Sequence, residues 1–147
     1  MTQPSLFGAP GASAAVANID GGSRGNPGPA GYGVRIERDD ASVVELKESV
    51  GIATNNVAEY RGLIAALAWA VQHGVSRLHV RSDSLLLVKQ MCGEYRVKNQ
   101  GLQPLWAQAR RLAQQVGDVR FEHVRRELNG EADRLANEAM DEASTEH

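Results

Sequence analysis

Four acidic residues stand at points of the sequence where a carboxylate can be held in a fixed place. Asp20 and Asp83 each follow an apolar run, and Glu59 and Asp133 lie in or near segments with a helical spacing of apolar residues. Four carboxylates without a histidine or cysteine ligand make an all-oxygen site, which suits Mg2+ or Mn2+. Two such ions about 4 Å apart are a known device for in-line cleavage of a phosphodiester bond.

Each of these residues also has a purely structural explanation. Asp20 can cap a turn, since aspartate and glycine are common turn residues. Asp83 precedes an expected helix, where aspartate is by default an N-cap. Glu59 follows the predicted N-cap Asn56 at the spacing of a capping box. Asp133 near a helix start offsets the helix dipole. Taken singly, each residue leaves both explanations open.

A glycine-rich loop follows the first expected strand, over residues 15–20, and Asp20 stands where that strand ends. Glycine-rich turns after a strand often cradle phosphates. However, a P-loop ends in Gly-Lys-Ser/Thr, and a dinucleotide fingerprint is followed by a helix. The segment Arg24-Gly25-Asn26-Pro27 supplies neither, so both kinds of nucleotide site are disfavoured.

The rest of the chain alternates between strand and helix patterns. Residues 32–37 and 44–50 alternate in period two and predict a hairpin that forms an antiparallel meander with the first strand. The further elements are a helix from Asn56 to His73, a strand over residues 78–80, helices over residues 85–91 and 102–116, a strand over residues 119–124, and a helix with Ala132, Leu135, Ala136 and Ala139 on one side.

This order of elements predicts an α/β fold with one five-stranded mixed sheet flanked by helices. Its first three strands are antiparallel, and right-handed crossovers return the fourth and fifth strands parallel to the first. Ligands of such sheets bind beyond the carboxyl ends of the strands. If the first and fourth strands are neighbours, Asp20 and Asp83 emerge side by side, and the flanking helices can turn Glu59 and Asp133 toward the same point.

Four segments, in this order along the chain, resemble ribonuclease H of type 1 in its short prokaryotic form. The segments are Ile19-Asp20-Gly21-Gly22-Ser23 with Gly25-Asn26-Pro27-Gly28-Pro29-Ala30-Gly31-Tyr32-Gly33, then Thr54-Asn55-Asn56-Val57-Ala58-Glu59, then Ser82-Asp83-Ser84, and Ala132-Asp133-Arg134-Leu135-Ala136. Any one of them would be a weak match, whereas the four together are specific.

The resemblance implies the ribonuclease H-like fold and metal-dependent endonucleolytic cleavage of the RNA strand of RNA–DNA hybrids, with 3′-hydroxyl and 5′-phosphate ends. It implies contacts with the hybrid's minor groove from three asparagines and with a DNA-strand phosphate from Thr54. The asparagines are Asn26, Asn55 and Asn56. The carboxylates that it implies to be catalytic, and to hold two Mg2+ or Mn2+ ions, are Asp20, Glu59, Asp83 and Asp133.

Three features depart from the pattern of the relatives. Many relatives have a glycine–histidine loop before the last helix, where this chain has Arg125-Arg126-Glu127-Leu128, and His123 lies inside the expected strand. Relatives often carry a basic, tryptophan-containing protrusion, whereas this chain offers only Arg96 and Lys98. We expect neither the N-terminal hybrid-binding domain of some relatives nor the phosphatase domain to which similar short forms are fused.

Charge and length limit the kinds of partner. The 147 residues fit one domain, and 16 Lys and Arg against 18 Asp and Glu give a net charge of -2. Contacts with a polyanion must therefore be local or metal-assisted. We predict a mobile lead-in over residues 1–13, a catalytic domain over residues 14–141 and a fraying tail over residues 142–147. The cations that could contact phosphates are Arg24, Arg96, Lys98, Arg125 and Arg126, and Arg125 and Arg126 are predicted to bind substrate.

The single cysteine, Cys92, excludes an internal disulfide and favours a reducing compartment, so we expect a cytoplasmic protein. No run is long enough to cross a membrane, and we expect a monomer without an obligate protein partner. Two other functions stay open, namely a catalytically silent nucleic-acid-binding module and a nuclease of the same superfamily with another substrate. The four carboxylates disfavour the first, because uncompensated negative charge does not help to bind a polyanion.

Overall fold

Alternating apolar side chains build the antiparallel half of the sheet. The structure is a computed structural model that describes residues 13–146. In β1 (Ala14–Ser23), every second side chain up to Ile19 is buried. β1 pairs antiparallel with β2 (Gly28–Arg38), which pairs antiparallel with β3 (Val43–Ala53).

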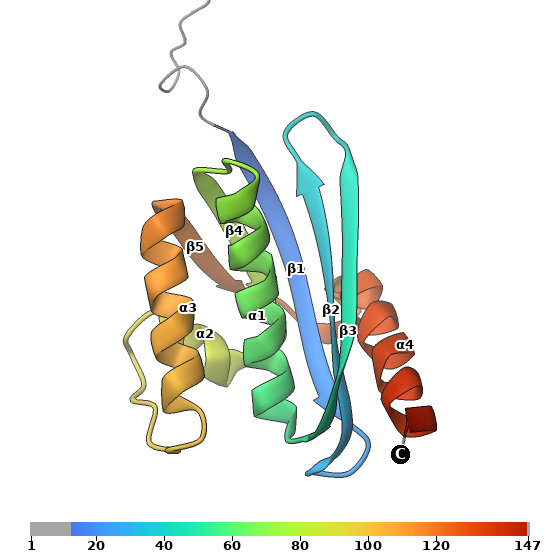
Figure 1. The fold of residues 1–147 in the computed structure, drawn as a ribbon. Coiled ribbons are helices and arrows are strands. Elements are labelled where there is room, and N and C mark those ends of the chain that lie inside the picture. Colours follow the sequence, from blue (N-terminus) through green and yellow to red (C-terminus); the bar gives the residue numbers. More distant parts are fainter. Residues whose placement is uncertain (1–12, 147) are drawn as a thin grey trace, which may run out of the picture.

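The parallel half of the sheet lies on the other side of β1. β4 (Arg77–Ser82) pairs parallel with β1, and β5 (Asp118–His123) pairs parallel with β4. The strand order is β3-β2-β1-β4-β5 (Figure 1). The prediction of a five-stranded mixed sheet, antiparallel over its first three strands and parallel beyond them, is confirmed.

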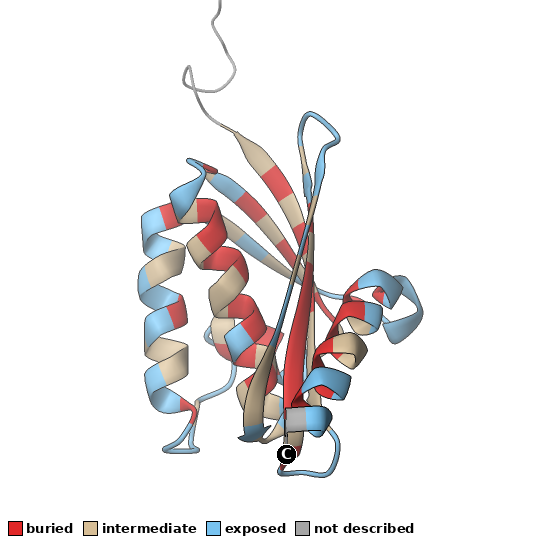
Figure 2. Ribbon diagram, turned by 45° about the vertical axis from the view of Figure 1, so that its right-hand side comes forward, coloured by how far each residue is buried: buried red, intermediate tan, exposed pale blue. Residues whose placement is uncertain are grey.

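Helices cover both faces of the sheet (Figure 1). On one face, α1 (Asn55–Gln72) packs against β1 and β2, with α3 (Gln103–Val116) beside it and the short α2 (Leu85–Met91) near the end of β4. On the other face, α4 (Gly130–Glu146) packs against β1, β2 and β3 after a 3-10 turn, η1 (Arg126–Leu128). Buried residues concentrate on α1 and the central strands (Figure 2). In the described part of the chain, no helix combines the length and the apolar character needed to cross a membrane.

Two strand glycines allow the helices to approach the sheet closely. A Cβ at Gly33 would collide with the Leu135 side chain and lie 2.5 Å from the Ala132 carbonyl oxygen, both on α4. On the opposite face, a Cβ at Gly21 would lie 2.5 Å from the Ala58 carbonyl carbon on α1. Any larger residue would therefore push the helix away from the sheet.

The first strand is longer than its sequence predicts. Asp20 was expected at its end, but β1 continues to Ser23, which pairs with Ala30 of β2. The glycines after Asp20 stay extended because the partner strand β2 already begins at Gly28, inside the predicted loop. Asp20 therefore lies within a strand and not at a turn.

The last helix also extends beyond the predicted domain end at residue 141. It continues to Glu146, because Ala143 is buried against the fold and Lys47 of β3 lies 2.9 Å from the Glu142 carboxylate. The predicted mobile lead-in lies outside the described residues except for residue 13, and so does residue 147.

We predict that Gly33→Ala lowers the free energy of unfolding by roughly 1–3 kcal/mol, the usual cost of overpacking. Gly130→Ala is the matched control, since nothing lies within 4 Å of a Cβ at this first residue of α4. It should be neutral or stabilising. Urea unfolding measures both variants, and equal stabilities would contradict the close packing of α4 on Gly33.

Candidate metal centre

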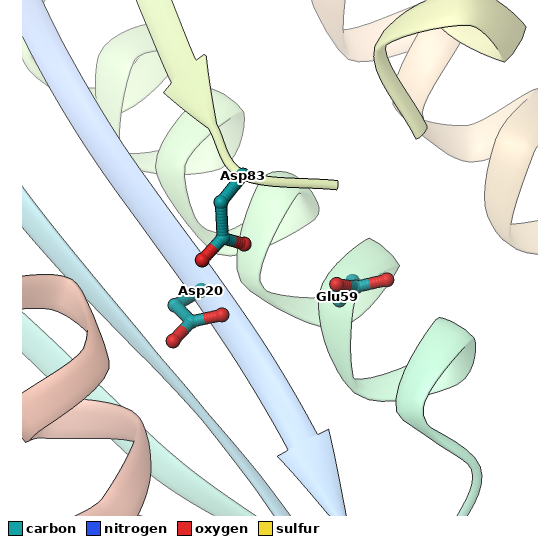
Figure 3. A group of neighbouring side chains, drawn as sticks. All are labelled: Asp20, Glu59 and Asp83. Atoms are coloured by element: carbon teal, nitrogen blue, oxygen red, sulfur yellow. The ribbon is translucent and has the colours of Figure 1, made fainter. Parts of the chain in front are cut away.

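Asp20 and Asp83 follow residues that lie opposite each other in neighbouring strands. The parallel pairing of β1 and β4 ends at Ile19 and Ser82. Asp20 comes next in β1, and Asp83 comes next where β4 stops. Figure 3 shows both carboxylates directed toward the same space.

Glu59 reaches this space from α1. Because Thr54 is the N-cap of α1, Glu59 lies in the second turn of the helix, where Gly21 leaves room for its backbone beside β1. One carboxylate oxygen from each of Asp20, Glu59 and Asp83 lies within 4.8 Å of the other two (Figure 3). Carboxylates from β1, from α1 and from the end of β4 therefore converge on one point.

Asp133 approaches from the opposite face of the sheet, in the first turn of α4. It lines the same cleft, shares a side-chain hydrogen bond with Asp20 and repels the charge of Asp83. The structure thus brings all four predicted carboxylates to one cleft, three of them within mutual ligand distance.

Burial and mutual repulsion raise the pKa values of Asp20, Glu59 and Asp83 and make these three carboxyl groups hard to ionise. Burial, and then the charge of Asp83, raises the pKa of Asp20 to about 8. Burial raises the pKa of Glu59 to about 7, against a hydrogen bond with the Ser84 side chain that lowers it. The pKa of Asp83 is also raised by burial, while the charge of Arg126 opposes that rise.

Besides the turn-cap explanation of Asp20, which lies within β1, two more of the structural explanations for the acidic residues are wrong. α2 is capped by Ser84, whose Oγ accepts a backbone N–H of the first turn at 3.2 Å, and not by Asp83. The N-cap of α1 is Thr54 and not Asn56, so Glu59 is not the partner in a capping box. Neither carboxylate is needed to cap a helix. Asp133 does lie in a first turn, where its charge offsets the helix dipole.

The donor set fits a hard divalent cation. All its donors are carboxylate oxygens, the ligands that Mg2+ and Mn2+ prefer. Like charges held this close disfavour one another's ionisation, and a bound cation would supply the missing opposite charge. Asp20, Glu59 and Asp83 are the residues that could hold it directly.

A cleft of about 750 Å3 surrounds the carboxylates, and Asn55 and Asn56 line it. The exposed Asn26 lies beside it, and its side-chain oxygen accepts the backbone N–H of Asn55 at 3.0 Å. The Asn55 side-chain oxygen in turn accepts the backbone N–H of Ser23 at 2.8 Å. With Thr54 as the helix cap, the four predicted polar contacts form one group that joins the β1–β2 loop to the start of α1.

The two predicted arginines are placed differently. Arg126 borders the cleft, with its Nε 4.0 Å from Asp83 Oδ2, and its side chain is 84% exposed. Arg125 instead lies 3.9 Å from Glu127 and does not line the cleft. Of these two arginines, only the exposed Arg126 therefore lies beside the carboxylates.

Two further residues lie at the site without a predicted role. Ser84 caps α2 and hydrogen-bonds to Glu59. His123 ends β5 opposite Ser82, and its charge acts to lower the pKa of Asp83. A serine directly before an apolar helical run is a recognisable N-cap signal. The position of His123 depends on the register of β5 against β4, for which the sequence carries no signal.

A second hollow, of about 640 Å3, lies at the other ends of β1 and β4. Asp118 of β5 lies there 3.9 Å from Arg77 of β4 and 3.5 Å from Arg120 of its own strand. Among the residues that the structure describes, this hollow contains no group of three carboxylates close enough to share a cation. The chemistry of the described residues is therefore concentrated at the first cleft.

Known proteins are similar to this chain both in sequence and in fold. The family model described as "Reverse transcriptase-like" matches residues 18–139. The bifunctional protein Rv2228c of Mycobacterium tuberculosis is 53% identical over 131 residues, or 88% of this chain and 36% of that protein. The solved N-terminal RNase H domain of Rv2228c superposes with a TM-score of 0.88 at 50% identity and covers 92% of this chain and 99% of that one.

Two further proteins extend the comparison. Ribonuclease HI of Halobacterium salinarum is 44% identical over 128 residues, which are 86% of this chain and 64% of that protein. LC11-RNase H1, solved in complex with an RNA/DNA hybrid, superposes with a TM-score of 0.82 at 41% identity, over 88% of this chain and 98% of that one. The chain thus spans only about a third of the mycobacterial relative, 36% of its length.

The raised pKa values predict a pH dependence of the metal-free protein. Between pH 3.8, the ordinary pKa of Asp20, and about 8, its pKa in the folded protein, the folded state binds more protons than the unfolded state. Stability should therefore fall as the pH rises through this window. Asp20→Asn removes the group and should melt above the wild type near the upper limit but not near the lower one.

Thermal melts in chelator measure this effect. Asp40→Asn is the control, because hydrogen bonds from Ser42 lower the pKa of this exposed carboxyl group. Its loss should not raise the melting temperature at the upper limit. An Asp20→Asn variant with the same pH profile as the wild type would contradict the buried, repelling cluster.

Proposed function

Because the chain belongs to the ribonuclease H type 1 family, we propose that it is a hydrolase that cleaves the RNA strand of RNA–DNA hybrids. The observation that carries this proposal is the convergence of Asp20, Glu59 and Asp83 within 4.8 Å in a cleft that also holds Asp133. We further propose endonucleolytic products with 3′-hydroxyl and 5′-phosphate ends.

The first role of the carboxylates is to bind the divalent cations and to hold them in fixed positions. Two bound Mg2+ or Mn2+ ions would activate a water molecule and stabilise the leaving oxygen of the phosphodiester. Asp20 and Asp83 approach from neighbouring strands and Glu59 from α1, so their oxygens converge from different directions. The hydrogen bond between Ser84 and Glu59 restrains the glutamate side chain. Asp133 completes the set from the opposite face of the sheet.

Proton release is coupled to cation binding. Burial raises the pKa of Asp20 to about 8 and that of Glu59 to about 7 in the metal-free protein, so near neutral pH Asp20 is mostly protonated and Glu59 is protonated in about half of the molecules. Binding of a divalent cation requires the ionised carboxylates and therefore displaces these protons. Cation affinity, and with it cleavage, should rise with pH through this range.

The polar group beside the cleft supports a hybrid as the substrate. A hybrid exposes 2′-hydroxyl groups and base edges in a wide, shallow minor groove. The short amides of Asn26, Asn55 and Asn56 can exchange hydrogen bonds with such edges. The resemblance to the family implies that Thr54, next to Asn55, contacts a DNA-strand phosphate. LC11-RNase H1, a relative of this chain, has been solved with an RNA/DNA hybrid.

Two alternatives differ in how they explain the carboxylates. A catalytically silent binding module would gain nothing from four acidic groups that repel a polyanion. A nuclease for another nucleic acid keeps the chemistry but leaves the group of three asparagines unexplained. We also propose that the protein acts as a cytoplasmic monomer, and its single cysteine, Cys92, supports the reducing compartment.

The deciding assay uses labelled RNA–DNA, RNA–RNA and DNA–DNA duplexes, each with Mg2+, with Mn2+ and with excess chelator. We expect cleavage of the RNA strand of the hybrid only, and only with a divalent ion. Cleavage in chelator would refute the metal-dependent mechanism, and preferential cleavage of another duplex would favour the alternative nuclease.

We predict that Asp83→Asn lowers hybrid cleavage at least about a hundredfold, a loss typical of one electrostatic catalytic group. The metal-free protein should stay at least as stable, because Ser84 and not Asp83 caps α2. Glu122→Gln, a 48% exposed carboxylate of β5, is the control that should leave cleavage unchanged. Near-wild-type cleavage by Asp83→Asn would remove this residue from the catalytic set.

We predict that hybrid affinity falls with salt and that Arg126 contributes to this salt dependence. Phosphate contacts supply most of such affinity, and the net charge of -2 leaves few cations to make them. Arg126→Ala should reduce the slope of log K against log salt concentration by about 1. Arg120→Ala, at the second hollow, should leave the slope unchanged. A binding titration at several salt concentrations decides, and equal slopes would refute the contact.

A further inference from the structure

Asn129 is a buried polar residue at the junction of β1 and α4. It is only 1% exposed, and both polar atoms of its side chain have partners. Its Nδ2 donates to the Ile19 carbonyl at 2.8 Å, and its Oδ1 accepts from the Asn18 side chain at 3.0 Å. Both partners belong to β1, directly before Asp20.

The residue stands at the start of α4 without using its side chain as a cap. Its backbone carbonyl accepts the N–H of Asp133 at 3.0 Å, the first hydrogen bond of the helix. Asparagine at this position normally caps the helix by accepting an N–H of the first turn with its side chain. Here that side chain is turned away from the helix and bonded to β1 instead.

We propose that Asn129 is a positioning residue that sets the placement of Asp133 relative to Asp20. Its side chain holds the carbonyl of the residue before Asp20, while its backbone starts the helical turn that carries Asp133. A buried amide with both ends satisfied has one favourable geometry, because any shift leaves a buried polar group unpaired. The inference rests on the proposed function, in which these carboxylates hold cations.

Asn18 sets the direction of the Asn129 amide. Its Nδ2 donates to Asn129 Oδ1, which leaves the NH2 end of that amide facing the Ile19 carbonyl. Asn18 is only partly buried, so its substitution should disturb the fold less than that of Asn129. Without this donor the amide can turn, and the bond to Ile19 weakens.

The test compares variants that leave the charge of the site unchanged. Asn129→Ala removes both hydrogen bonds, and Asn18→Ala removes only the orienting one. Val116→Ala is the control for a general loss of stability, since this buried residue ends α3 and does not line the cleft. For each variant, thermal melts in chelator, Mn2+ affinity by calorimetry, and kcat and KM on the hybrid are measured below the melting temperature.

We expect Asn129→Ala to lower Mn2+ affinity and kcat about tenfold or more, in the range found for residues that orient metal ligands. KM should change less than kcat, and Asn18→Ala should show a smaller loss in the same direction. Val116→Ala should melt at a lower temperature with unchanged Mn2+ affinity and kcat. That contrast separates positioning from stability.

The proposal is overturned if folded Asn129→Ala keeps wild-type Mn2+ affinity and kcat, or if Val116→Ala shows the same losses. If Asn129→Ala does not fold, Asn18→Ala decides by the same criteria. A wild type that binds Mn2+ but does not cleave the hybrid would refute the proposed function, while the Mn2+ affinities would still test the positioning role.

Discussion

Glycines at two positions of the β1–β2 hairpin let α1 and α4 pack directly on the backbone of the sheet, and this contact holds the acidic residues together. At Gly21 the backbone of α1 fills the space that a Cβ would occupy, and at Gly33 the backbone of α4 does so on the other face. A sheet normally keeps a helix at a distance set by the side chains between them. Here the two helices come close enough for Glu59 and Asp133 to approach Asp20 from opposite faces.

This close approach concentrates like charge, which opposes folding when no cation is bound. The raised pKa values of Asp20 and Glu59 express that opposition, since burial first, and the charge of Asp83 after it, favour the protonated form of each group. The apolar layer between α1 and the sheet compensates. Leu63 and Leu67 of α1 are fully buried there, and each such side chain contributes roughly 1.5–3 kcal/mol. The scaffold can therefore carry a locally unfavourable site.

Most cations of the protein serve the fold and not the cleft. Arg134 of α4 lies 2.7 Å from Glu45 of β3, and Lys47 of β3 lies 3.0 Å from Glu138 of α4. These pairs are partly exposed, so each is weak, but together they join the edge strand to the helix. Arg24 is likewise engaged with Asp141 at 3.0 Å. Among the cations that line the cleft, Arg126 is the one that lies near a carboxylate of the site, 4.0 Å from Asp83.

The sequence by itself determined the order and type of the elements and the identity of the four carboxylates. Apolar periodicity is local, so α2 begins and ends at the predicted residues 85 and 91, and the mixed sheet follows from connection rules. Two features become clear only from the folded chain, namely that β1 continues past Asp20 and that Asn129 joins β1 to α4. These features depend on strand register and on contacts between segments far apart in the chain, such as the 110 positions between Ile19 and Asn129. Packing selects such contacts, and no local pattern of residues encodes them.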